Sequence, residues 1–214
     1  DAGWRALALR NGEFLFREMV RDGRVLRSHK DGVSRITGFL EDYAAVGLGA
    51  LALYELTFDS DWLARARSLA DAMVHWFWDD DADAFFDTPR DHEELLTRPR
   101  DITDNATPAG TSLAVELLLR LGDLLGDEDM TRRARFVLET VAEPMARYPL
   151  AFGHALTAAD LAVFGAVEVA LIGGGDATSN DMAALVRAAS APFVPSLGLA
   201  GGSVAGTDGV ALLA

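Results

Sequence analysis

The sequence repeats itself, and this repeat constrains the fold more than any other feature of the chain. Residues 53–73 recur 68 residues later as residues 121–141. The matched pairs are Leu53 with Leu121, Leu56 with Leu124, Asp59 with Asp127, Asp61 with Asp129, Ala66 with Ala134, Arg67 with Arg135, and Met73 with Val141. Self-similarity at a fixed offset indicates a repeat architecture, in which each unit buries its apolar face against its neighbours.

Each copy of the repeat joins an apolar helix to an amphipathic one. Residues 43–53 are apolar on every side of a helix, which predicts an inner helix buried all round, and residues 113–125 are nearly as apolar. Two outer helices follow from apolar side chains at helical spacing: Trp62, Ala66, Leu69, Met73 and Phe77 in the first copy, and Ala134, Val137, Val141 and Met145 in the second. A third inner helix is expected over residues 153–164.

This alternation predicts an all-α fold of the α/α toroid type. A closed ring of inner and outer helices needs about six hairpins, so the chain holds roughly half of one. Residues 1–165 are predicted to form the hairpins. Residues 166–214 are predicted to form a small α/β element and tail of the same domain, with strands near 167–172 and 193–199 around a helix over 181–189. Both ends look cut, so we expect a fragment that exposes apolar surface.

Composition narrows the classes of partner. The 214 residues carry a net charge of −14, so neither nucleic acid nor an anionic membrane surface is an expected partner. The chain has no cysteine, which excludes disulfides, a thiolate nucleophile and cysteine-based metal sites within it, and favours a cytoplasmic location. The apolar stretch 43–56 is too short to cross a bilayer.

Loop lengths locate the functional face. The inner-to-outer turns, residues 58–60 and 126–128, are short, whereas the outer-to-inner connections, residues 22–37 and 79–106, are long. The long loops therefore emerge at the end that carries the N-termini of the inner helices, and long loops in compact folds are often functional. Thr107 and Pro108 suit the N-cap and first position of the helix that follows the second loop.

Three successive inner helices begin with polar residues, and these are the candidate catalytic groups. They are Asp42, Asp104 and His154. Glycoside chemistry needs two carboxylates, one as acid and one as base or nucleophile, and histidine serves in proton transfer. Helix capping is the alternative, because acidic residues in a first turn complement the helix dipole. If Asp104 is catalytic, Asp104→Asn should abolish sugar binding or turnover with little effect on stability.

Further polar residues of the same rim are candidates for binding the substrate. They are His29, Lys30, Asp31, Tyr43, Asp87, His92 and Asn105. Solvated loop side chains are the alternative for most of them. No metal site and no cofactor are expected, because the chain lacks the HExxH motif and any other metal-binding pair of histidines.

Several of these segments together resemble a known family. They are residues 26–32 (Leu-Arg-Ser-His-Lys-Asp-Gly), 38–44 (Gly-Phe-Leu-Glu-Asp-Tyr-Ala), 85–88 (Phe-Phe-Asp-Thr), 104–112 (Asp-Asn-Ala-Thr-Pro-Ala-Gly-Thr-Ser), 152–154 (Phe-Gly-His) and 167–173. In this order they resemble the YyaL / spermatogenesis-associated protein 20 family. The resemblance implies an N-terminal thioredoxin-like domain, absent here, and a domain similar to six-hairpin glycosidases and sugar epimerases, of which this chain resembles the second half.

Two hypotheses of function follow. In the first, the toroid acts on sugars, as a hydrolase or an epimerase, through carboxylates and histidine at its rim; fold analogy alone supports a sugar or other small polar ligand. In the second, it is a non-catalytic scaffold for a partner such as the missing N-terminal domains. Whether Asp42, Asp104 and His154 share a cavity, or are held in caps and ion pairs, discriminates between the two.

Overall fold

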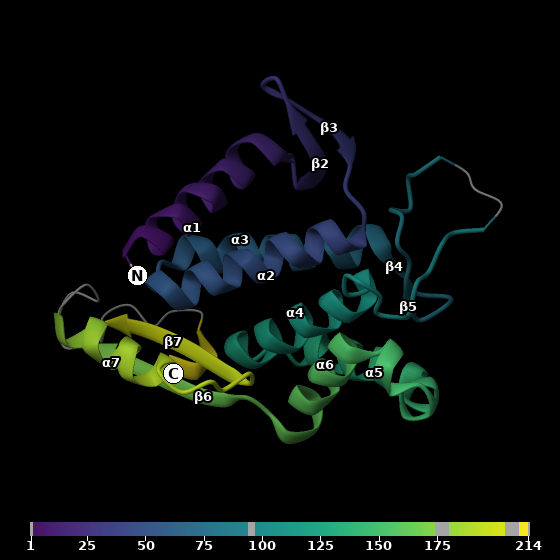
Figure 1. Cartoon of the computed structure of the whole chain (residues 1–214). Coiled ribbons are helices and arrows are strands. Elements are labelled where there is room, and N and C mark those ends of the chain that lie inside the picture. Colours follow the sequence, from purple (N-terminus) through teal and green to yellow (C-terminus); the bar gives the residue numbers. More distant parts are fainter. Residues whose placement is uncertain (1, 94–96, 174–179, 204–209, 214) are drawn as a thin grey trace.

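The computed structural model describes residues 2–93, 97–173, 180–203 and 210–213, and this part of the chain is mainly helical (Figure 1). The helices are α1 (Ala2–Phe14), α2 (Leu40–Thr57), α3 (Ser60–Phe77), α4 (Gly110–Leu125), α5 (Glu128–Arg147), α6 (Gly153–Phe164) and α7 (Asn180–Ser190). The strands are β1 (Val20–Arg21), β2 (Arg24–Lys30), β3 (Val33–Thr37), β4 (Trp78–Asp79), β5 (Ala84–Phe85), β6 (Val167–Gly173) and β7 (Leu197–Ser203). Single helical turns occupy Leu15–Met19, Pro149–Ala151 and Ala211–Leu213.

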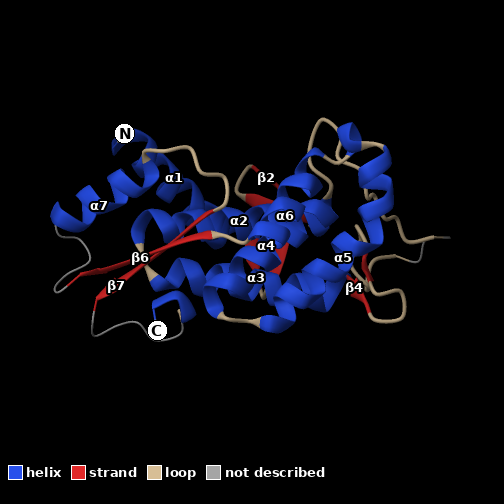
Figure 2. Ribbon diagram, turned by 90° about the horizontal axis from the view of Figure 1, so that it is seen from below, coloured by secondary structure: helices blue, strands red, loops and turns tan. Residues whose placement is uncertain are grey.

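Two helical hairpins, α2–α3 and α4–α5, form the centre of the molecule, as the repeat predicted. Helix α2 packs on α4, and α4 packs on α6, so the three predicted inner helices are neighbours (Figures 1 and 2). Every apolar position predicted on the two outer helices is buried. The prediction of a mainly helical fold is therefore confirmed.

The turns of the two hairpins are built alike. Phe58 and Gly126 end α2 and α4 with φ of 57° and 67°, in the left-handed region that closes a helix. The next residues, Asp59 and Asp127, are the N-caps of α3 and α5. Each side chain accepts a hydrogen bond from the backbone N–H two residues further on, at 3.0 and 3.2 Å. The repeat is therefore a repeat of capping geometry as well as of apolar positions.

The contact between α2 and α4 depends on glycine. A Cβ atom added at Gly47 would lie 2.5 Å from Cδ2 of Leu117, and one added at Gly110 would lie 3.0 Å from the backbone nitrogen of Glu41. The separation at Gly110 is tight, and the one at Gly47 is too short for a real side chain, so any larger residue at Gly47 would push the two helices apart or displace the Leu117 side chain.

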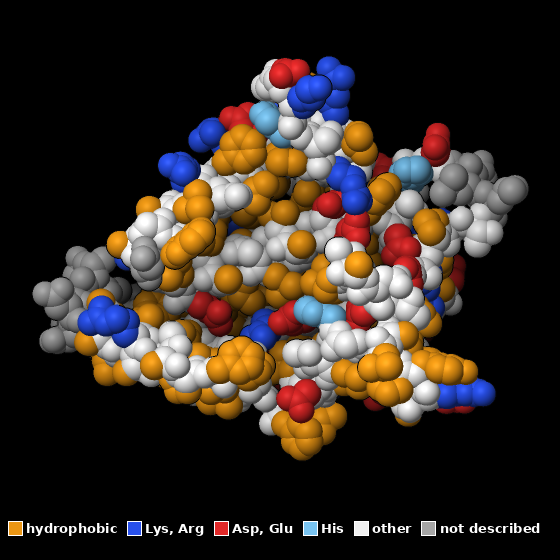
Figure 3. All heavy atoms as spheres, in the orientation of Figure 1, with side chains coloured by type: hydrophobic (Ala, Val, Ile, Leu, Met, Phe, Trp, Pro, Cys, Tyr) orange, Lys and Arg blue, Asp and Glu red, His pale blue; other side chains and the backbone are white. Residues whose placement is uncertain are grey.

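Helix α2 is not buried all round, which corrects one prediction. Ala45, Gly49 and Ala52 are exposed and lie along one side of the helix, at a spacing of three to four residues. Helix α3 covers a second side of α2 and α4 a third. Leu56, 37% exposed, continues this side, and the surface is hollowed beside α2 (Figure 3). The apolar pattern therefore predicted burial for positions that are in fact exposed.

Strands form where long loops were expected. Residues 20–37 form a three-stranded antiparallel sheet, β1-β2-β3, whose turns carry Asp22-Gly23 and Asp31-Gly32, all with positive φ. Asp-Gly at two central positions favours the type I′ turns of β-hairpins, so this signal was present in the sequence. Strands β4 and β5 form a further antiparallel pair, in which Trp78 pairs with Phe85 and Asp79 with Ala84.

The C-terminal segment has the predicted strand–helix–strand order. Strands β6 and β7 are parallel, with α7 between them in sequence. The second strand begins at Leu197 instead of residue 193. Residues 174–179, which follow β6 and begin with two glycines, lie outside the described residues.

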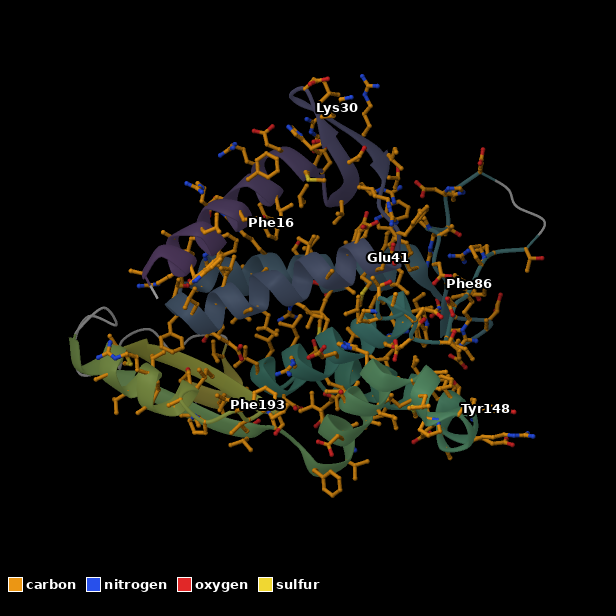
Figure 4. All side chains as sticks on the ribbon, in the orientation of Figure 1. Phe16, Lys30, Glu41, Phe86, Tyr148 and Phe193 are labelled. Atoms are coloured by element: carbon orange, nitrogen blue, oxygen red, sulfur yellow. The ribbon has the colours of Figure 1, made fainter. Side chains whose placement is uncertain are left out.

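Apolar surface is exposed on and after α6, as expected. Val163 and Phe164 are 74% and 80% exposed, and Phe193, labelled in Figure 4, is 93% exposed. Within the described residues, α6 is followed in the chain by strand β6 and not by an outer helix of the kind that follows α2 and α4.

Replacing either capping aspartate should destabilise its hairpin. We expect Asp59→Ala and Asp127→Ala each to lower the free energy of unfolding by about 1 kcal/mol, because the first N–H groups of α3 or α5 lose their acceptor. Asp→Asn at the same sites keeps an acceptor oxygen and should cost much less. Urea denaturation followed by circular dichroism measures both. An equal loss in the Ala and Asn variants would show that the acceptor oxygen is not what stabilises the hairpin.

Candidate functional site

A polar cavity lies at the N-terminal ends of α2 and α4, where the long loops were predicted to meet. Its volume is about 220 Å³. It is lined by Phe39, Glu41, Asp87, Asp101, Thr103, Asn105, Thr107, Pro108, Ala109 and Gly110, and is called the rim cavity below. Figure 4 labels Glu41 at this end of α2. Of the predicted site residues, Asp87 and Asn105 line it.

Asp42 lies beside the rim cavity, but its carboxylate serves the start of α2. Oδ2 of Asp42 accepts a hydrogen bond from the backbone N–H of Phe39 at 2.8 Å and lies 3.2 Å from Nη1 of Arg27. Burial raises the pKa of Asp42, and the Phe39 N–H and the Arg27 charge oppose that effect. Arg27 also contacts Oε1 of Glu41 at 2.6 Å. The Asp42 carboxylate therefore caps the start of α2, which was the alternative to a catalytic role.

Tyr43 belongs to the core and does not line the rim cavity. It is fully buried, and its ring meets Phe77 edge-on with 5.0 Å between ring centroids. Its hydroxyl has no hydrogen-bond partner among the described residues. The sequence pattern placed it at the rim because it follows two acidic residues, yet one residue along a helix turns the side chain by about 100°.

Asp104 joins three backbone segments through its carboxylate. Oδ1 accepts a hydrogen bond from the N–H of Ala109 at 2.9 Å, and Oδ2 accepts from the N–H groups of His154 and Ala155 at 2.8 and 3.0 Å. It thus fixes the residue before α4 and satisfies free N–H groups in the first turn of α6. The expectation of a carboxylate open to a ligand is corrected by this geometry.

The helix start predicted at Thr107 and Pro108 is wrong. Helix α4 begins at Gly110, and its N-cap is Ala109, which has no side-chain acceptor. Because the Asp104 carboxylate binds the Ala109 N–H, the chain from Thr107 to Ala109 stays outside the helix. Thr107 and Pro108 instead line the rim cavity.

His154 is held in an ion pair away from the rim cavity. Its Nε2 lies 2.8 Å from Oε2 of Glu116 on α4, and Oε1 of Glu116 accepts from Nε of Arg120 at 2.7 Å. The Glu116 carboxylate raises the pKa of His154. Burial opposes ionisation of Glu116, but His154 and Arg120 outweigh it, so the pKa of Glu116 is lowered. Sequence analysis missed Glu116 and Arg120, although their spacing of four residues on an apolar helix signals an ion pair.

Acceptor groups of the rim cavity remain open to a ligand. Oδ2 of Asp87 accepts from the N–H of Asp101 at 2.8 Å, and Oδ1 of Asp101 accepts from the N–H and hydroxyl of Thr103 at 2.9 Å. Within the described residues, the other oxygens of Asp87 and Asp101 and the side-chain amide of Asn105 have no protein partner. Burial raises the pKa of Asp87, and the Asp101 N–H opposes this.

The remaining predicted residues do not line the rim cavity. His29, Lys30 and Asp31 belong to the β2–β3 hairpin, whose Lys30 end projects from the molecule (Figure 4). Nδ1 of His29 lies 2.8 Å from the hydroxyl oxygen of Ser34, and Asp31 occupies the turn with φ of 52°. His92 lies against Phe39, with 6.4 Å between ring centroids.

The described residues can also be compared with the requirements of a metal site and of a membrane span. The described residues contain no group of three or more histidine, aspartate or glutamate side chains arranged to hold a metal ion. Among the helices of the described chain, none combines the length and apolarity that crossing a bilayer requires.

The fold and the rim cavity define a mainly helical protein of repeated helical hairpins with a polar cavity at the N-terminal ends of its inner helices. No protein-family model matches the chain. It is 30% identical to spermatogenesis-associated protein 20 of Rattus norvegicus and of Homo sapiens, over 200 residues that cover 88% of the chain and 25% of each relative. It is also 26% identical to an uncharacterised Caenorhabditis elegans protein, over 67% of the chain and 20% of that protein.

The chain belongs to the spermatogenesis-associated protein 20 family. It spans about a quarter of the length of the curated relatives it matches.

Removing the Asp104 carboxylate should destabilise the chain. We expect Asp104→Ala to lower the free energy of unfolding by about 3 kcal/mol, because three backbone N–H groups lose a charged acceptor. Asp104→Asn keeps one oxygen but turns an amide donor toward a backbone donor, so its cost should be intermediate. Asp160→Ala, at an exposed position on α6, is the matched control. If the midpoint of urea denaturation of Asp104→Ala equals that of the wild type, the capping role is contradicted.

The ion pair of His154 should make stability depend on pH. The raised pKa of folded His154 means that its contribution is fully present below the unfolded value of about 6.5 and is lost as pH rises through the folded pKa. The gap in unfolding free energy between wild type and His154→Gln should therefore be larger at about pH 5.5 than at about pH 9. The exposed His75→Gln is the control. A gap that grows toward high pH would contradict the pairing.

Proposed function

We propose that the chain provides the ligand-binding rim of a carbohydrate-binding helical domain, and that the rim cavity takes a small polyhydroxylated ligand. One observation carries this proposal: the cavity combines an aromatic ring, Phe39, with the acceptors of Asp87 and Asp101 and the amide of Asn105. Sugar hydroxyls donate to carboxylate oxygens and both donate to and accept from an amide. The apolar face of a sugar ring fits an aromatic side chain.

The size and charge of the rim cavity support the same ligand class. At about 220 Å³ the cavity is smaller than a typical drug-sized pocket, which suits a single sugar ring. Glu41, Asp87 and Asp101 make its lining acidic, the nearby Arg27 is paired with Glu41 and Asp42, and Arg100 acts on Asp87 without lining the cavity. This balance disfavours a phosphorylated or carboxylated ligand relative to a neutral one.

The architecture proposed for this function is part of an α/α toroid. Helical hairpins α2–α3 and α4–α5 and the neighbouring α6 support it, since they place successive inner helices side by side. In this arrangement the rim cavity lies at the mouth of the ring, where loops and N-terminal helix ends meet. Hydrolase or epimerase chemistry would then use groups beyond Asp42 and Asp104, whose carboxylates bind backbone N–H groups.

A second candidate function is a non-catalytic scaffold for other parts of the full-length protein. The carboxylates of Asp42 and Asp104 favour it, because both predicted catalytic acids bind backbone N–H groups and so stabilise the fold. It is also favoured by the exposed apolar side chains on and after α6.

Titration with sugars tests the proposed function. In isothermal titration with D-glucose and N-acetyl-D-glucosamine, wild type should bind at least one sugar with a Kd near the millimolar range. Asn105→Ala should weaken that binding about fivefold or more, through loss of hydrogen bonds to the ligand. Asn11→Ala, an exposed asparagine on α1, should bind as wild type does.

The two candidate functions give different results in this experiment. Binding that Asn105→Ala removes and Asn11→Ala leaves intact supports a carbohydrate site at the rim. If the chain is folded by circular dichroism and neither sugar gives a heat of binding, the carbohydrate proposal is overturned and the scaffold is favoured.

A further inference from the structure

A second cavity, of about 500 Å³, lies in the hollow between α2, α4, α7 and the segment that leads into β7. It is lined by Leu48, Leu51, Ala52, Glu55, Leu56, Glu116, Arg120, Val186, Ser190, Val194, Pro195, Leu197 and Leu199, and is called the inner cavity below. None of these residues lines the rim cavity. Figure 3 shows acidic, basic and histidine side chains gathered in the hollow.

Each nitrogen of Arg120, the one cation among the residues that line the inner cavity, donates a hydrogen bond to a protein group. The Arg120 guanidinium donates to Oε1 of Glu116 at 2.7 Å and to the backbone carbonyls of Pro195 and Leu197 at 2.9 and 3.3 Å. Glu116 is paired on its other oxygen with His154. Arg120 and Glu116 therefore balance each other's charge, and neither is free for an ionic ligand.

Glu55 is different, because no cation pairs with it. Its Oε1 accepts a hydrogen bond from the backbone N–H of Leu199 at 3.2 Å. Among the described residues no lysine, arginine or histidine lies within ion-pair distance of its carboxylate. Burial raises the pKa of Glu55 and nearby Glu116 adds to this, whereas the Leu199 N–H and the Arg120 charge oppose it. A cation brought to Glu55 would offset the cost of its burial.

The surroundings of Glu55 add negative charge. A smaller adjoining cavity is lined by Glu55 and Arg120 together with Asp123 and Glu168. Burial and the Glu168 charge raise the pKa of Asp123, and Arg135 and Arg120 oppose this. Counting Glu116, four carboxylates thus lie near three cationic side chains, Arg120, Arg135 and, when protonated, His154. The local field favours a cationic occupant.

The walls of the inner cavity are aliphatic. Leu48, Leu51 and Leu56 of α2 form one side, and Val186 and Val194 are among the residues opposite. Such walls suit an apolar body, and a cavity of this volume has room for a chain or ring of several carbons. A metal ion does not suit them, since the described residues offer no cluster of three ligands.

We propose that the inner cavity binds an organic cation, an amine carried on an aliphatic body, with its ammonium group on the Glu55 carboxylate. The aliphatic part lies along the leucines of α2. The site is independent of the rim cavity, and it requires no chemistry beyond binding.

Three probes of equal length test the charge requirement. Hexylamine, which is protonated at pH 7, hexan-1-ol and hexanoate are each titrated into the 214-residue chain by isothermal calorimetry, with circular dichroism as a check of folding. We expect hexylamine to bind at least about tenfold more tightly than hexan-1-ol, with no binding of hexanoate. Equal binding of the amine and the alcohol would show that only the apolar walls matter and would overturn the proposal, as would preferred binding of hexanoate.

Glu55→Gln tests the residue. Glutamine keeps an oxygen for the Leu199 N–H but carries no charge, so hexylamine binding should weaken at least about tenfold. Glu143→Gln, an exposed position on α5, is the matched control and should bind hexylamine as wild type does. Wild-type affinity in Glu55→Gln overturns the proposal. If Glu55→Gln fails to fold, the comparison of the three probes on wild type decides.

Discussion

The rim of this molecule depends on one carboxylate. Asp104 accepts hydrogen bonds from the residue before α4 and from the first turn of α6, so one side chain sets where two inner helices start. Because the chain from Asp104 to Ala109 is drawn around that carboxylate, Asn105 and Thr107 are presented to the rim cavity. The polar lining on which the proposed function rests is thus a consequence of backbone hydrogen bonding nearby.

Most of the helical fold could be predicted from the sequence, because local signals and packing agree there. The repeat carries both the apolar positions and the capping aspartates Asp59 and Asp127, and those determine where each hairpin turns. The prediction failed for the exposed side of α2, since alanine and glycine are equally typical of a buried contact and of a hollow. It also missed the β2–β3 hairpin, although its Asp-Gly turn is a recognised signal.

The candidate site was harder to predict, for a physical reason. An acidic residue at a helix start satisfies free N–H groups, and the same residue type in the same place can bind a ligand. Asp42 and Asp104 do the former, whereas Asp87 and Asn105 line the rim cavity. Only the direction of each side chain separates the two roles. Glu55 and Glu116 were not predicted as site residues, because a charged residue within an apolar helix is typical of its solvated side.

Small residues on the open side of α2 leave room beside the helix. Ala45, Gly49 and Ala52 project little from it, a Cβ added at Gly49 would meet no atom within 4 Å, and Ala52 lines the inner cavity. Backbone position there is fixed by the contact of Gly47 with Leu117 on α4. The room beside α2 and the spacing between α2 and α4 are therefore set by different residues. Substitution of the three exposed positions can change the shape and capacity of the hollow among homologues while the helix framework stays the same.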